Sequence, residues 1–428
     1  MNSLLAARYA KGHPAVFYGM PEYANVEPMV LNAHDGKQIR GLYWSPKMQP
    51  RPRTAVLAMH PRQDWGRHYT FPALIKAGIA CFGALTRSPN NDIATIHEEI
   101  ILDAEACVRF LKQERGVEQV ILLGNGGGGS LLAFYQAQAR KPRGQRLART
   151  PGGRPTVLND FDMVPADGLI LLNCHKGEGR FMNEVIDPAV VDERSPLLSD
   201  PDLDMYDARN GFRPAPQWSE YSDEFLQRFA AAQAARVARL DMQARSLIAE
   251  SGEAEHLLAD PDFRKLPAER QTFWQRRAAF EPVMTIYRTQ ARPAYVDRRI
   301  DPSARPYGSL LSGRPDVMNM MFQGFGRLAT PQAWLSTWSG HTSNADLHKR
   351  CAELMEPVLV LHAGKSPEIY RLGDAAATMS ALKSTDKTLL EFPEADHYFR
   401  PEARPGSSAS LDELMHAVVR WVAERFAV

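Results

Sequence analysis

The sequence predicts an α/β protein with a doubly wound, mostly parallel sheet and a helical insertion late in the chain. Continuous apolar runs, such as TAVLAM at 54–59 and QVILL at 119–123, are typical of strands buried on both faces of a parallel sheet. Segments with helical spacing of apolar residues separate these runs. From about residue 187 to residue 326 the strand signal is weak, and helices are expected instead. Such alternation favours parallel strands joined by right-handed helical crossovers.

The first third of the chain is expected to begin with a hairpin and to continue as alternating strands and helices. Asp35-Gly36 favours a tight turn between the first two strands. The Pro-, Gly- and Arg-rich segment 141–155 is expected to be an exposed loop. The elements expected up to residue 173 are strands at 27–33, 38–44, 54–59, 80–84, 119–123 and 168–173, and helices at 71–77, 92–115 and 131–139.

The rest of the chain is expected to insert a helical cap before the sheet resumes. Ser222 is a suitable N-cap for a long helix, and Pro267 suits the first turn of a second one. The sheet pattern returns at 358–363 and 388–392, and an amphipathic helix at 411–426 follows. The predicted domains are a core formed by 1–186 and 331–428, and a cap at 187–330. A cap in this place would cover the carboxyl ends of the strands, where open α/β sheets bind ligands.

Bulk composition indicates an ordinary soluble globular enzyme. Lys and Arg number 51 against 50 Asp and Glu, so the net charge of +1 gives no reason to expect nucleic acid or an anionic membrane as a partner. The four cysteines have no zinc-like spacing, and no signal peptide or membrane-spanning run is evident. We therefore expect a cytoplasmic protein with a small-molecule substrate, no metal and no cofactor, and a homodimer is one candidate assembly.

The segment Gly124-Asn125-Gly126-Gly127-Gly128 carries the strongest local signal. It lies between a predicted buried strand and a predicted helix, and it resembles the nucleophile elbow Gly-x-Ser-x-Gly of α/β-hydrolases. An elbow turns so sharply that its flanks must be small. Gly126 then occupies the position of the nucleophile, and glycine cannot attack. Ser130 in a shifted frame is a weaker candidate, because Leu132 would fall where a small residue is required.

The loop after strand 54–59 is expected to contribute to an oxyanion hole. It reads His60-Pro61-Arg62-Gln63, where hydrolases of this fold often carry His-Gly. Because proline has no N–H, the Arg62 amide is the expected donor, paired with the amide of Gly127. An equally simple interpretation is that His60-Pro61 shapes a turn. Substrate contacts are expected from Gln63, Trp65 and Trp338.

His397 is the expected catalytic base. It follows the last predicted strand in Glu394-Ala395-Asp396-His397 and keeps the chain order nucleophile, acid, histidine. The acid is harder to assign. After strand 358–363 its usual place is occupied by Ser366, so Glu368 is the preferred acid. The alternatives are Glu178 and Asp187, after an earlier strand, and Asp374, which is expected to lie in a solvated helix.

The whole chain resembles a group of bacterial capped α/β-hydrolases. The segments that carry the resemblance are LLGNGGGGSLLAFYQAQA, PADGLILLN, DPAVVDERSPLLSDPDLDMY, WLSTWSGHTSNADL and PEADHYF. The resemblance implies an α/β-hydrolase fold with an inserted helical cap domain and a serine esterase-like activity, with Gly126 at the family's serine. Many aromatic residues in the cap suggest a lipophilic or aromatic ester or lactone as the substrate.

Three interpretations of Gly126 stay open on the sequence alone. The chain could be a hydrolase inactivated by replacement of its serine, or a natural pseudoenzyme that binds a ligand in the old pocket. It could also be a non-hydrolytic enzyme, of the lyase or cofactor-free oxygenase type, in which His397 acts as a general base without a covalent intermediate.

Overall fold

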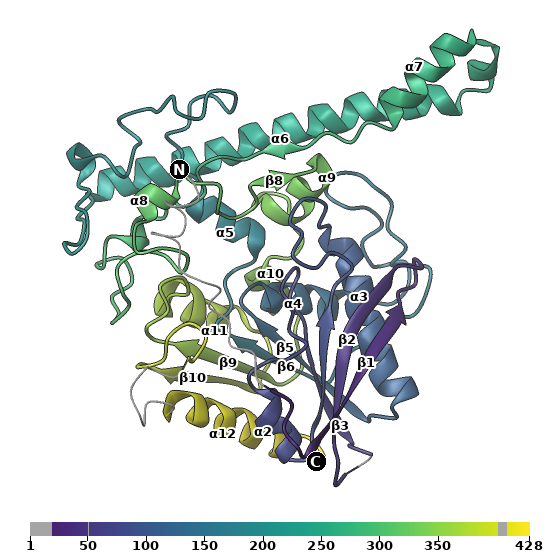
Figure 1. Ribbon diagram of the computed structural model, residues 1–428, viewed down its shortest axis with the longest axis vertical. Coiled ribbons are helices and arrows are strands. Elements are labelled where there is room, and N and C mark those ends of the chain that lie inside the picture. The colour runs from purple at the N-terminus through teal and green to yellow at the C-terminus, as the bar shows by residue number, and fades with distance from the viewer. Residues whose placement is uncertain (1–18, 50, 401–408) are drawn as a thin grey trace.

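The computed structural model describes residues 19–49, 51–400 and 409–428. An eight-stranded sheet crosses the molecule in the order β1-β2-β4-β3-β5-β6-β9-β10 (Figure 1). Its strands are β1 (Ala24–Asn32), β2 (Gln38–Pro46), β3 (Thr54–Ala58), β4 (Ala80–Leu85), β5 (Gln119–Asn125), β6 (Gly168–Leu172), β9 (Val358–Ala363) and β10 (Lys387–Phe392).

The pairing of the strands identifies the fold. β2 pairs antiparallel with both β1 and β4, and every other neighbouring pair in this sheet is parallel. The β1–β2 hairpin turns at Asp35-Gly36 as expected, with Gly36 at a φ of 79°. This order, with an antiparallel second strand, is that of the α/β-hydrolase fold, and the predicted fold class is confirmed.

Helices cover both faces of the sheet, which explains the continuous apolar runs. Along β3, Leu57 packs into one core and its neighbour Val56 packs into the other. On the Leu57 side lie α3 (His97–Arg109), α4 (Gly127–Ala139), α10 (Leu347–Cys351) and α11 (Ala377–Ala381), and on the Val56 side lie α2 (Phe71–Lys76) and α12 (Ala409–Ala423). The helix expected at 92–115 is shorter: α3 starts at His97 and continues as the π-helix η1 (Phe110–Glu114).

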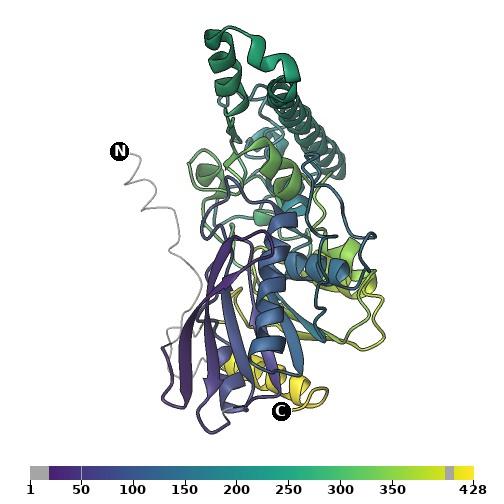
Figure 2. The same cartoon turned by 90° about the vertical axis from the view of Figure 1, so that its right-hand side faces the viewer.

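A mainly helical insert lies between β6 and β9, above one end of the sheet (Figures 1 and 2). It has its own apolar core, which also uses Phe181, Val185, Trp334 and Trp338 from outside 187–330. The limits predicted for the cap, 187–330, and for the core, 1–186 and 331–428, therefore remain predictions. Besides α10, β9 and α11, the elements between β6 and β10 are α5 (Glu178–Val185), η2 (Ala208–Asn210), α6 (Asp223–Ala259), η3 (Pro261–Lys265), α7 (Ala268–Ala278), β7 (Met284–Thr285), η4 (Pro293–Tyr295), α8 (Pro315–Met318), β8 (Leu328–Ala329), α9 (Pro331–Ala333), η5 (Trp334–Trp338) and η6 (Arg371–Ala376).

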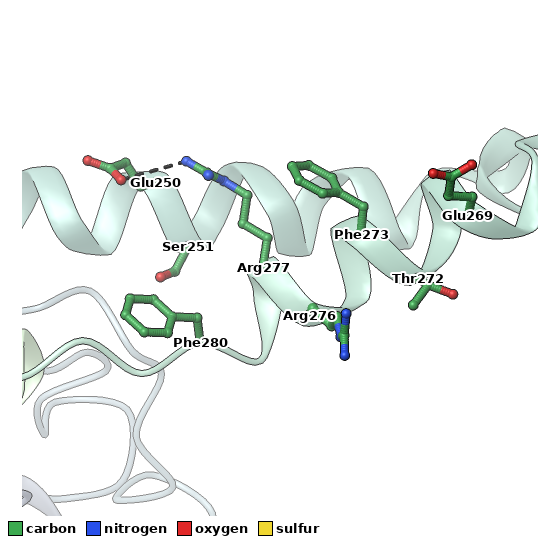
Figure 3. A pocket seen from close by; sticks show the side chains of 8 residues that line it. All are labelled: Glu250, Ser251, Glu269, Thr272, Phe273, Arg276, Arg277 and Phe280. Atoms are coloured by element: carbon green, nitrogen blue, oxygen red, sulfur yellow. Dashed lines mark ion pairs between the residues drawn. The ribbon is translucent and has the colours of Figure 1, made fainter.

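The far half of α6 and the antiparallel α7 form an arm that projects away from the body (Figures 1 and 2). At the arm Glu250 pairs with Arg277 at 3.7 Å, and Phe273 and Phe280 lie beside them (Figure 3). A hollow of about 670 Å³ lies here, open to solvent and remote from the strand ends. No helix in the described ranges is long and apolar enough to cross a membrane.

Candidate active site

The turn from β5 to α4 has the geometry of a nucleophile elbow with an empty side-chain position. Gly126 has φ 57° and ψ −120°, a conformation that residues with a side chain rarely adopt. A Cβ at Gly124 would lie 2.4 Å from the Gly129 nitrogen, and one at Gly128 would lie 2.3 Å from the Met59 oxygen. At Gly126 the nearest atom to an added Cβ is His60 Nε2, 3.9 Å away. The flanks of the elbow must therefore be glycine, whereas Gly126 has room for a larger residue.

Hydrogen bonds hold the elbow and the His397 loop at the same end of the sheet. The Gly126 amide donates to the Leu172 and Asn173 carbonyls at the end of β6. Asn173 in turn donates from Nδ2 to the His397 carbonyl at 2.6 Å and accepts the Ala363 amide at 2.7 Å. Its backbone adopts a φ of 45°, in the left-handed region that asparagine tolerates better than most residues. One asparagine therefore connects β6, β9 and the His397 loop.

The partner of the His397 ring is Ser366. Ser366 Oγ lies 2.8 Å from His397 Nδ1 and accepts the amides of Glu368 at 3.3 Å and Ile369 at 3.0 Å. A hydroxyl has two acceptor lone pairs and one hydrogen. Because both lone pairs are used, the Ser366 O–H donates to Nδ1, and the neutral ring carries its proton on Nε2. Burial lowers the pKa of His397 to about 3, so the ring is neutral at physiological pH.

The predicted acids lie elsewhere. Glu368 is buried with its Oε2 unpartnered, and the structure gives it no hydrogen bond to His397. Burial raises the Glu368 pKa to about 7. Asp187 pairs with Arg288 at 2.7 Å inside the insert. Asp374 is buried, not solvated as expected; it accepts the Tyr370 amide at 2.8 Å and lies 4.0 Å from Arg292.

The loop after β3 is organised around the His60 ring. His60 Nδ1 accepts the Arg62 amide at 3.2 Å and the Gln63 amide at 3.1 Å. The Arg62 amide, the expected oxyanion donor, is thus directed at its own loop and does not point over the elbow. Gln63 also hydrogen-bonds Tyr398, next to His397. Trp65 is buried against the Tyr398 ring, with 6.2 Å between centroids.

Glu178, the first residue of α5, lies directly over the elbow. A Cβ at Gly127 would be 2.3 Å from Glu178 Oε1. Arg62 Nη1 donates to the same oxygen at 2.9 Å, while Oε2 has no hydrogen-bond partner and lies 3.8 Å from His175 Nε2. Burial favours a raised pKa for Glu178, but the Arg62 charge and the neighbouring histidines outweigh it and lower the pKa to about 2. This carboxylate is therefore ionised.

Aromatic residues of the insert enclose the Arg62 side chain. Its guanidinium lies 5.1 Å from the Trp338 ring centroid and 5.9 Å from that of Phe325, and it also pairs with Asp92 at 3.3 Å. Trp338, predicted to contact substrate, reaches the site through this stacking. Its ring is fully buried.

Sequence reasoning missed His175 and His97, two buried histidines beside Glu178. The signal available for His175 was its position directly after strand 168–173, at an end of the sheet where ligands bind. His97 gave no signal, because it belongs to a helix whose start was predicted too early. Neither ring nitrogen of His97 has a hydrogen-bond partner.

A cavity of about 370 Å³ opens beside His397. It is lined from the core by His397, Lys365 and Pro367 and from the insert by Ala304 and Pro306. The ring is thus accessible from the junction of core and insert. Within the described residues, no group of three or more His, Cys, Asp or Glu side chains is arranged to hold a metal ion.

Comparisons with known proteins extend only to the fold. No protein-family model and no curated protein matches the chain. Similar solved structures include the siderophore hydrolase EstB from Aspergillus fumigatus, at 10% identity and a TM-score of 0.47, covering 96% of this chain and 100% of that one. Est1E from Butyrivibrio proteoclasticus is 12% identical with a TM-score of 0.43, covering 93% and 98%. The esterase EaEST from Exiguobacterium antarcticum is 11% identical with a TM-score of 0.39, covering 93% and 100%.

Proposed function

We propose that this chain binds a carboxylic ester or lactone on a hydrolase scaffold from which serine-type turnover has been lost. The observation that carries the proposal is the hydrogen bonding of Ser366. A triad needs a carboxylate that accepts the His397 Nδ1 proton and leaves Nε2 free to take a proton. Here the Ser366 hydroxyl donates to Nδ1, so Nε2 is protonated. With Gly126 at the elbow, both the nucleophile and the triad acid are replaced.

The two replacements together favour a binding protein over a hydrolase inactivated at one position. Exchange of the serine for Gly126 alone leaves Ser366 unexplained. Simple decay of the site is also disfavoured, because a cluster of buried ionisable side chains remains beside the elbow. They are Glu178, His60, His97 and His175.

The ligand that fits these surroundings is lipophilic or aromatic. Trp338 and Phe325 flank Arg62 on the insert side, and Trp65 packs against Tyr398 on the core side. Aromatic walls with a few polar groups are typical of small-molecule sites. A buried site of this kind favours aryl or alkyl esters and lactones over small polar substrates.

The proposal predicts that two substitutions are needed to restore hydrolysis. In Gly126→Ser with Ser366→Asp, the new Oγ attacks the carbonyl carbon and His397 Nε2 takes its proton. The π electron pair of the carbonyl moves to oxygen and forms a tetrahedral intermediate. When that pair re-forms the carbonyl, the C–O bond to the alcohol breaks and His397 protonates the leaving alcohol. Water then attacks the acyl-enzyme by the same route and releases the acid. A neutral acid position lowers turnover of serine hydrolases by about 10⁴-fold through the wrong histidine tautomer. We expect Gly126→Ser alone to be slower than the double variant by about 10² to 10⁴-fold.

The experiment measures hydrolysis of p-nitrophenyl esters and aryl lactones by the unchanged chain, both single variants and the double variant. Gly126→Ser with Ser366→Asn is the matched control, because asparagine has the shape of aspartate without its charge. The unchanged chain should bind the same esters, detected by ligand-observed NMR, without turnover. Turnover by the unchanged chain at the rate of the double variant, or absence of ester binding, contradicts the proposal.

The alternative of a non-hydrolytic enzyme with His397 as a base is tested separately. Nε2 carries a proton in the assigned tautomer and cannot accept another at neutral pH. A His397→Ala variant of the unchanged chain should therefore keep its ester binding. Loss of an activity present in the unchanged chain would favour the base-only enzyme instead.

A further inference from the structure

The His60 side chain is fixed as a hydrogen-bond donor beside the elbow. Its Nδ1 accepts two backbone amides, those of Arg62 and Gln63. A ring nitrogen that accepts N–H groups cannot carry a proton. Burial lowers the pKa of His60 well below its usual range, so the ring is neutral and its one proton is on Nε2. The backbone of the loop thus selects the tautomer.

The Nε2–H of His60 faces the space above Gly126. Nε2 lies 3.9 Å from where a Cβ on Gly126 would be and 3.2 Å from where a Cβ on Gly127 would be. The His60 side chain is buried, with 4% of its surface exposed. Nε2 has no hydrogen-bond partner among the described residues. The amide of Gly127, the first residue of α4, has no partner within the helix and points to the same end, whereas the Gly129 amide donates to the Gly126 carbonyl at 3.3 Å. A side-chain donor and backbone donors therefore converge at the elbow.

The charge around these donors distinguishes between ligands. The carboxylate of Glu178 lies at Gly127, and Asp92 is the second carboxylate of the cluster. Within 19–49, 51–400 and 409–428, Arg62 is the cation that pairs with both, at 2.9 Å and 3.3 Å, so its charge is already matched. An anion at the elbow would face Glu178 without a free cation, and two like charges a few ångströms apart repel by several kcal/mol at an effective dielectric constant of about 20. A neutral carbonyl oxygen has no such penalty.

We propose that His60 Nε2–H and the Gly127 amide hold the carbonyl oxygen of a neutral ligand above Gly126, and that Glu178 excludes the corresponding carboxylate. This inference rests on the proposed ester binding and adds its selectivity. The site would retain an intact ester, lactone or amide and reject the free acid that hydrolysis gives. His60, instead of the Arg62 amide, supplies the second donor.

The test compares two ligands of equal shape and different charge on the unchanged protein. Phenylacetamide and phenylacetate differ at the head group, and methyl phenylacetate represents the ester. Affinities come from titrations followed by the ring C–H resonances of His60. We expect the amide to bind about tenfold more tightly than the acid, or more, and to shift the His60 resonances. Equal or tighter binding of phenylacetate overturns the proposal, and so does the absence of any shift with the amide and the ester.

Two further measurements separate His60 and Glu178. Nitrogen-15 NMR of the unchanged protein should show a protonated Nε2 and an unprotonated Nδ1 in His60, and the opposite tautomer refutes the donor role. His60→Gln keeps an N–H donor while His60→Phe removes it, so amide affinity should fall more in the second. Glu178→Gln should raise the affinity for phenylacetate and so reduce the preference for phenylacetamide over phenylacetate. Restored hydrolysis in the double variant without amide preference leaves the proposed function intact and rejects this inference alone.

Discussion

Ser366 determines which nitrogen of His397 carries the proton. The hydroxyl is saturated by two backbone amides and can only donate to the ring. Moving the ring proton to Nδ1 would bring it against that O–H, so the ring and the hydroxyl would have to reorient together. A carboxylate in the same place would accept the two amides and the Nδ1 proton. The residue at position 366 therefore decides whether His397 Nε2 is a hydrogen-bond donor, as with serine, or a general base, as with a carboxylate.

This reasoning predicts a change in the titration of His397. Ser366→Asp places an anion beside Nδ1, which favours the charged imidazolium, and should raise the His397 pKa from about 3 by roughly 1–3 units. The measurement is an NMR titration of the His397 ring resonances. Ser366→Asn, which adds no charge, should leave the pKa close to its present value. An equal rise in both variants would show that side-chain volume, not charge, sets the pKa.

At the scale of the element, the first half of α6 fixes the insert and the second half forms the arm. The buried side chains Phe225, Phe229 and Val237 all lie before residue 245. Beyond it Leu247 and Ile248 still pack against the core of the insert, whereas Glu250 pairs with Arg277 of α7 and Phe273 is 57% exposed. The N-terminal half of α6 is therefore the part that packs into the insert above the candidate site.

The N-cap of α6 should contribute measurably to stability. Ser222 Oγ accepts the Phe225 amide at 3.2 Å, and Asp223 and Glu224 occupy the first turn. Ser222→Ala removes the acceptor and should lower the free energy of unfolding by about 1 kcal/mol, measured by urea denaturation. Ser222→Asn keeps a capping oxygen and should change it by a few tenths at most. Equal losses in both variants would mean that the cap hydrogen bond is not the cause.

The sequence predicts elements better than the contacts between them. The inner parallel strands of the large sheet are evident as apolar runs, because they are buried on both faces, and β1 and β2 are evident as a hairpin. Gly126 and His397 are found by chain order and by their position after strands. The His60 tautomer is not, because it depends on the direction of two backbone amides in its own loop. The Glu178 carboxylate over Gly127 is not either, because it is held by Arg62, which is 116 residues away in the chain. Asp374 is predicted to be solvated for the same reason: its burial depends on Arg292 and the fold around it.

At the scale of the whole molecule, stability against pH is a sum of opposing titrations. Burial lowers the pKa of His68 to about 3 and of His97 to about 4. Their contributions are present above the unfolded value near 6.5 and are lost as the pH falls. Glu368 acts in the opposite sense, because burial raises its pKa to about 7 from an ordinary 4.5. The pH dependence of the free energy of unfolding of one protein therefore cannot be attributed to any single titrating group.

The contribution of Glu368 can be isolated by comparing the free energy of unfolding of the unchanged protein with that of a Glu368→Gln variant. Its folded pKa lies above the unfolded one, so the stability it contributes is complete below about pH 4.5 and is lost as the pH rises through 7. The loss is roughly 3 kcal/mol, because each pKa unit corresponds to about 1.4 kcal/mol. Glu368→Gln does not titrate, so relative to the unchanged protein its free energy of unfolding should improve by that amount between about pH 4.5 and pH 8. The histidine contributions are common to both proteins and cancel. Curves that run parallel over this range would show that the Glu368 carboxyl has its ordinary pKa in the folded protein.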